Sequence, residues 1–138
     1  MAKHTVDVLA PAERQRLQKL HRVLLRLHKV LLDDERSAYE KQHGRTAPGE
    51  MLQIVIGNPQ FAWLRRISEL IVEIDEILDS QEATASAAAS DSITQGRALL
   101  VPGDASEFAR KYQDALQRQP DAVLAHKDVA AILSRDDH

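Results

Sequence analysis

The sequence predicts an all-α protein: a single antiparallel helical bundle with a long first helix and about five helices in all. Apolar residues recur every three or four positions over long stretches, whereas no stretch shows the sustained alternation of a half-buried strand. Four of the five prolines stand at the start of such a helical pattern, where a missing N–H is tolerated: Pro11, Pro48, Pro59 and Pro120. The 138 residues suit one domain, with residues 1–10 as an N-terminal tail and residues 11–138 as the bundle.

The first helix is expected over residues 11–43. Pro11 stands at its first position, and Gly44 follows its last residue as a left-handed cap. At 1.5 Å per residue such a helix is about 50 Å long. Its apolar side carries Leu17, Leu20, Val23, Leu24, Leu27, Val30 and Leu31.

The second and third helices are expected over residues 48–56 and 59–81. Gly57 ends the first of these, and the side chain of Asn58 is suited to cap the next. The third helix has a continuous apolar side along its length. Its members are Trp63, Leu64, Ile67, Leu70, Ile71, Ile74, Ile77 and Leu78.

Residues 82–103 are expected to form a linker or irregular segment within the domain. Their first part, residues 82–92, contains only small or polar side chains, so it offers no large apolar group that could dock a helix. Alanine favours the helix, which leaves an extension of the third helix as the alternative.

The last two helices are expected over residues 104–118 and 120–134. Asp104 and Glu107 have the spacing of a capping box at the start of the first. Phe108, Tyr112, Ala115 and Leu116 then follow the apolar period of a helix.

Charge is distributed unevenly behind a net charge of −3. Residues 1–66 contain 12 Lys and Arg against 7 Asp and Glu, whereas residues 67–138 contain 6 against 14. A basic stripe on the first helix comprises Lys19, Arg22, Arg26 and Lys29, and an acidic stripe on the third comprises Glu69, Glu73 and Glu76. Such stripes are commonly solvated faces, and they also suit charge-complementary docking between subunits or with a partner protein.

Two leucines of the first helix indicate where a partner docks. Leu25 and Leu32 lie about 100° from the centre of the apolar arc, too far round for a narrow core seam. The leading hypothesis is therefore a non-enzymatic protein-interaction or regulatory module that binds a protein partner or itself, as a homodimer. The expected partner-binding residues are Leu25, Leu32, Lys19, Arg22, Arg26 and Lys29.

The alternative hypothesis is a metal- or haem-binding bundle. His21, His28 and Glu35 are seven residues apart and lie within the apolar arc of the first helix. Asp75 borders the apolar side of the third helix, and His126 lies near the middle of the apolar side of the last. A seven-residue step spans about 10.5 Å, so one straight helix cannot give both histidines to one metal ion. These five residues are the metal candidates. A structural network is the preferred interpretation of these groups, with His28 paired with Asp75, or His21 with Tyr112.

Several other classes are not indicated. There is no cysteine, which excludes disulfides and thiolate zinc sites, and none of the common phosphate-binding or nucleophile motifs occurs. The acidic balance and the few aromatic residues make nucleic acid an unlikely partner. The longest apolar run, Val129 to Leu133, is too short to span a membrane, and no export signal is evident, so a cytoplasmic location is expected.

Overall fold

The computed structural model describes residues 8–80, 85–101 and 106–134, and these residues form helices with no strand among them. The all-α prediction is confirmed. The elements are α1 (Pro11–His43), α2 (Pro48–Gly57), the 3₁₀ helix η1 (Pro59–Leu64), α3 (Arg65–Asp79), α4 (Ala85–Leu100), α5 (Glu107–Arg118) and α6 (Pro120–Leu133).

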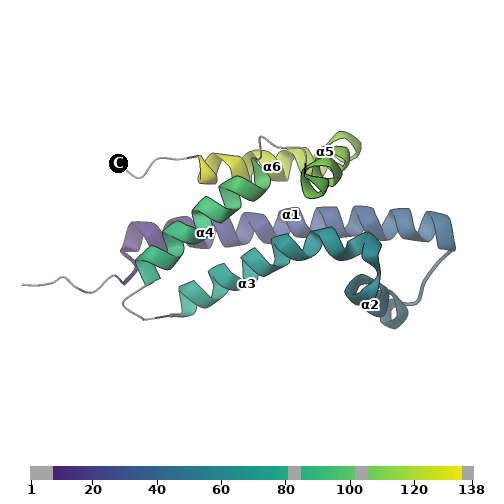
Figure 1. Cartoon of the computed structure of the whole chain (residues 1–138), viewed down its shortest axis with the longest axis horizontal. Helices are drawn as coiled ribbons and strands as arrows, with labels where there is room; N and C mark the ends of the chain where they lie inside the picture. The colour runs from purple at the N-terminus through teal and green to yellow at the C-terminus, as the bar shows by residue number, and fades with distance from the viewer. Residues whose placement is uncertain (1–7, 81–84, 102–105, 135–138) are drawn as a thin grey trace, which may run out of the picture.

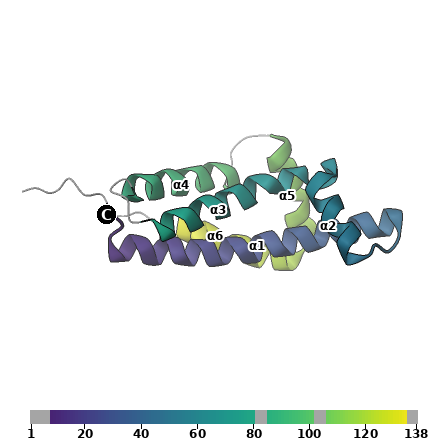
Figure 2. The same ribbon diagram turned by 90° about the horizontal axis from the view of Figure 1, so that it is seen from below.

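The long helix α1 is the spine of the bundle. Helices α3 and α6 lie along it and run in the opposite direction (Figure 1). Helix α4 returns antiparallel to α3, and the view from below shows α3 between α1 and α4 (Figure 2). Helices α2 and α5 lie towards the end of the bundle where α1 finishes. The predicted antiparallel arrangement is therefore present.

The core is built on the predicted apolar side of α1. Leu17, Leu20, Leu24, Leu27 and Leu31 are completely buried. The helix begins where Glu13 Oε1 accepts a hydrogen bond from the Ala10 N–H at 2.9 Å, and it ends at Gly44, which has a φ of 90°. That φ is costly for residues other than glycine, so the sequence itself fixes the end of the helix.

The predicted helix over residues 59–81 is divided into two parts. The Asn58 side chain accepts from the Gln60 N–H at 2.9 Å, as expected of a cap, but the chain then forms the 3₁₀ helix η1 before α3 starts. In a 3₁₀ helix residues i and i+3 eclipse, so Phe61 and Leu64 point the same way. Both are buried, together with Trp63.

The prediction of a linker is wrong for residues 85–100, which form α4. Its buried side is made largely of small residues: Ala85, Ala89, Ser92, Ile93, Gly96, Leu99 and Leu100. A Cβ placed on Gly96 would lie 3.1 Å from Leu133 Cδ2 and 3.4 Å from Leu70 Cδ2. Small side chains thus let α4 approach its neighbours closely. Residues 82–84 and 102–103 lie outside the described residues.

The ends of several helices are held by arginines. Arg97 donates to the carbonyl oxygen of Leu133 at the end of α6, with distances of 3.0 and 2.6 Å. Arg14 donates to the carbonyl oxygen of Leu78 near the end of α3, at 2.8 Å. Carbonyl groups at a helix C-terminus lack helical partners and attract cations, so these contacts stabilise the helix ends.

The start of α5 differs from the prediction by a few residues. The Ser106 side chain accepts from the Ala109 N–H at 3.1 Å, so Ser106 is the cap. Asp104, the predicted cap, lies outside the described residues, as do residues 1–7 of the predicted N-terminal tail.

Candidate functional site

The first pair of metal candidates bridges α1 and α3. His21 Nε2 lies 3.7 Å from Asp75 Oδ1, and the Asp75 side chain is 72% exposed. The sequence suggested a pair between His28 and Asp75, but in the structure Asp75 contacts His21. The contact places residue 21 of α1 level with residue 75 of α3.

Glu35 has a structural role in holding η1 against α1. Its two carboxylate oxygens accept hydrogen bonds from Gln60 Nε2 at 2.9 Å and from Trp63 Nε1 at 2.7 Å. A carboxylate with both oxygens engaged in this way orients the single tryptophan of the chain.

His126 pairs with Tyr112, so the expected contact of Tyr112 with His21 is not formed. The Tyr112 hydroxyl lies 2.7 Å from His126 Nδ1. Burial lowers the pKa of His126 and raises the pKa of Tyr112. Both shifts favour neutral side chains at this hydrogen bond.

The five metal candidates are therefore separated among different contacts. Within residues 8–80, 85–101 and 106–134, no three His, Asp or Glu groups lie close enough together to hold a metal ion. The described geometry therefore does not bring the five candidates together around one metal ion.

His28 lines a groove instead. The groove has a volume of about 250 Å³ and lies between α1, α2, η1 and α3. The histidine makes no hydrogen bond with another described residue, and burial lowers its pKa. The lining is mostly apolar: His28, Leu32, Val55, Ile56, Phe61, Leu64, Arg65 and Ser68.

Near the groove, α1 and α3 each carry an exposed apolar side chain, Leu25 and Val72. Ser68 lines both this groove and a shallow hollow around Val72. Leu25 lies one helical turn before His28. We call this surface the apolar strip, and define it as Leu25, His28, Leu32, Ile56, Ser68 and Val72. Its helices α1, α2 and α3 are visible together in Figure 2.

Three side chains of the apolar strip are unusually exposed for their type. Leu25 is 47% exposed, Ile56 59% and Val72 56%. Leu32, which the sequence placed on a free flank, is instead half-buried against the core and forms part of the groove wall. Scattered exposed apolar residues are ordinary on a protein surface, whereas these three lie in or near one groove.

Opposite charges border the two long edges of the apolar strip. On α1, Arg22 and Lys29 are exposed on the side of Leu25. On α3, Glu69 and Glu76 are exposed on either side of Val72. Two basic residues predicted to join this surface lie elsewhere: Arg26 pairs with Asp128 of α6, and Lys19 is seven residues before Arg26, on the same side of α1.

Sequence reasoning missed Ile56 and Val72, and also Leu52, which is 58% exposed one turn before Ile56. Val72 lies within the acidic stripe of α3, where an apolar residue has no core role. Leu52 and Ile56 are four residues apart, so they share one side of α2. The spacing of Leu52 and Ile56 and the position of Val72 among glutamates can be read from the sequence. Their exposure follows only once it is known which side of α2 and of α3 faces the core.

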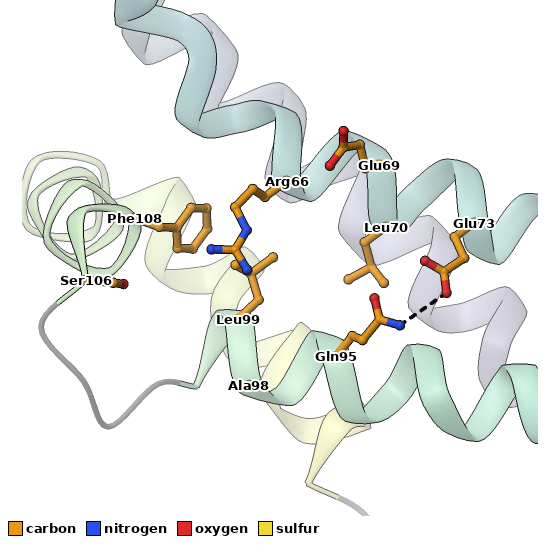
Figure 3. Close-up of a pocket in the computed structure, with 9 residues that line it drawn as sticks. All are labelled: Arg66, Glu69, Leu70, Glu73, Gln95, Ala98, Leu99, Ser106 and Phe108. Carbon is orange, nitrogen blue, oxygen red and sulfur yellow. Dashed lines mark hydrogen bonds between the residues drawn. The ribbon is translucent and has the colours of Figure 1, made fainter.

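A second cavity, of about 450 Å³, lies between α3, α4 and the start of α5 (Figure 3). The Arg66 guanidinium lies 5.8 Å from the centre of the Phe108 ring. Glu73 accepts hydrogen bonds from Ser92 at 2.9 Å and from Gln95 at 3.4 Å. Glu73 thus fixes α4 on α3, and the mixture of charges around the cavity does not converge on one ligand chemistry.

Comparisons of the chain with family models, with curated proteins and with solved structures found no match. Among the described residues, no helix is both long and apolar enough to cross a membrane.

Proposed function

We propose that the protein is a non-enzymatic helical interaction module, and that the apolar strip is the surface on which a protein partner docks. The observation that carries this proposal is a set of three exposed apolar side chains in and near the His28 groove. Ile56 lines the groove, Val72 shares a hollow with Ser68 of the groove wall, and Leu25 lies one helical turn from His28. Removing such side chains from water stabilises a complex by roughly 25 cal/mol for each Å² of apolar surface buried, before the costs of association are subtracted.

The composition of this surface supports the proposal. Protein interfaces combine an apolar centre with a polar, charged rim. The apolar strip has such a centre, and Arg22, Lys29, Glu69 and Glu76 form its rim. His28 lies half-buried in the groove and has no hydrogen-bond partner among the described residues, so it is available to a polar group of the partner.

The test is site-specific photo-crosslinking in cells that express the protein. A photo-reactive phenylalanine analogue replaces Leu25, Ile56 or Val72 in turn, and the adducts are identified by mass spectrometry. We expect all three positions to crosslink to the same protein, through one surface of that protein. Leu124, which is 60% exposed on α6, is the matched control and should give no such adduct.

A result in which the three positions of the apolar strip give no protein adduct, or give the same background as Leu124, contradicts the proposal. Wild-type helical content by circular dichroism confirms that each substituted protein is folded, so the result reports on the surface alone.

A further inference from the structure

We propose that the occupant of the apolar strip is a second copy of this chain, related by a two-fold axis parallel to α1 and α3. This inference rests on the proposed function and names its partner. In this arrangement α1 of each copy packs against α3 of the other.

The first argument is a matched pattern of charge on the two helices. On α1, Leu25 is preceded by Arg22 at three residues and followed by Lys29 at four. On α3, Val72 is preceded by Glu69 at three residues and followed by Glu76 at four. The two helices thus present the same spacing around an exposed apolar residue, with opposite charges.

The second argument is the register of the two helices. The contact between His21 and Asp75 places these residues level with each other. Since α1 and α3 are antiparallel and rise equally per residue, Leu25 is then close to level with Val72. A two-fold axis parallel to the helices keeps every level unchanged. It therefore brings Leu25 of one copy opposite Val72 of the other.

The same operation aligns the charged edges. Arg22 comes to lie opposite Glu76 of the second copy, and Lys29 opposite Glu69 of the second copy. Both pairs occur twice, because a two-fold interface is self-complementary. A two-fold axis perpendicular to the helices would instead pack α1 of one copy against α1 of the other. Like charges would then face each other, which is unfavourable.

The third argument is that these charges are available. Among the described residues, Arg22, Glu69 and Glu76 form no salt bridge. Lys29 pairs only with Asp33 on its own helix, at 2.9 Å, and both side chains are exposed. Such exposed pairs contribute little to stability, so Lys29 can exchange its partner at little cost.

The experiment measures dimerisation of the full chain by sedimentation equilibrium, in variants in which the charges on one edge of the apolar strip are reversed. One variant carries Arg22→Glu and Lys29→Glu, and the other carries Glu69→Lys and Glu76→Lys. We expect the wild type to form a dimer and each variant to dissociate about 100-fold more readily, because every edge then faces its own charge. An equimolar mixture of the two variants should form a heterodimer, and the chain with all four changes should dimerise again.

The control variant carries Lys19→Glu and Lys127→Glu. It changes the net charge as much as the first variant does, but its two exposed residues lie off these edges. It should dimerise as the wild type does. All the substituted residues are exposed, and recovery in the mixture shows that each variant is folded.

Two results would overturn this inference. If the wild type stays monomeric up to millimolar concentration, the second copy is not the occupant, and crosslinks from Leu25, Ile56 and Val72 to another protein would leave the proposed function intact. If the wild type dimerises and neither edge reversal weakens it, the proposed pairing of α1 with α3 is wrong. Absence of all crosslinks overturns the proposed function itself.

Discussion

The Tyr112 hydroxyl and His126 Nδ1, 2.7 Å apart, join α5 to α6 at the edge of the core. The two rings also meet edge to face, with their centres 5.4 Å apart. Tyr112 is completely buried, so its hydroxyl depends on this histidine for a partner. A buried polar group without a partner is costly, which makes the pair a sensitive point of the fold.

Removal of the hydroxyl by Tyr112→Phe should lower the free energy of unfolding by about 1 kcal/mol, because the ring packing is kept and the hydrogen bond is lost. Chemical denaturation followed by circular dichroism measures this. The control is Tyr39→Phe on α1, whose ring stacks on His43; it should change the value by less than about 0.5 kcal/mol. Equal losses in the two variants would contradict the assigned role of the pair.

Stability should fall as the pH falls below about 6.5, the usual pKa of histidine. Burial lowers the folded-state pKa of both His28 and His126, so the unfolded chain binds protons more readily. The stabilising contribution is complete above the unfolded pKa and decreases as the pH falls towards the folded pKa.

Denaturation curves between pH 5 and 8 test this expectation. His126→Gln should flatten the pH dependence, and His28→Gln together with it should flatten it further. Lys127→Gln, on the exposed side of α6, should leave the pH dependence of the wild type unchanged. A pH dependence that survives in the double histidine variant would show that other groups cause it.

Gly96 should not tolerate a large side chain. A Cβ there already lies 3.1 Å from Leu133 Cδ2, so Gly96→Leu would overpack the contact of α4 with α6 and destabilise the fold by about 1–3 kcal/mol. Gly49→Leu is the matched control, since no atom lies within 4 Å of a Cβ at that position. Thermal unfolding compares the two. A wild-type melting temperature for Gly96→Leu would refute the close approach of α4.

Asp34 should be more important than its neighbour Asp33. Asp34 is buried and accepts hydrogen bonds from Arg118, the shorter at 2.6 Å, and from Gln119 at 2.8 Å, whereas Asp33 is exposed. The hydrogen bond to Asp34 is the main cause that raises the pKa of Arg118. Asp34→Ala should lower the free energy of unfolding by about 1–3 kcal/mol, and the loss should lie towards the lower end because the Arg118 side chain is partly exposed. Asp33→Ala should lower it by less than about 0.5 kcal/mol. Chemical denaturation of the two variants measures both losses.

Much of the fold could be predicted from local rules. The leucines of α1 repeat at helical spacing, and proline and glycine mark the ends of helices, so α1, α2 and α6 were located closely. Helix α4 was missed because its buried side consists largely of alanine, serine and glycine. Their role depends on the large residues of other helices, such as Leu70 and Leu133, which no local pattern reveals.

The candidate site was harder to predict for the same reason. The sequence predicted Leu25 and the basic stripe as parts of the site. Which basic residues lie beside the apolar strip depends on the position of α6, because Arg26 pairs with Asp128 of that helix whereas Arg22 does not. The histidine pairs also differ from the prediction: Asp75 pairs with His21 and Tyr112 with His126, because pairing depends on the level at which two helices meet.

The most direct test of the central claim, that a second copy of the chain docks on the apolar strip, is the mass in solution of the double variant Leu25→Glu and Val72→Glu. For a chain of 15.4 kDa, sedimentation equilibrium should give twice that mass for the wild type and a single chain for the variant, with unchanged helical content. The control Leu124→Glu should behave as the wild type. A double variant that retains the wild-type dimer would contradict the account, because the four carboxylates that the two copies contribute cannot be accommodated at the centre of an interface.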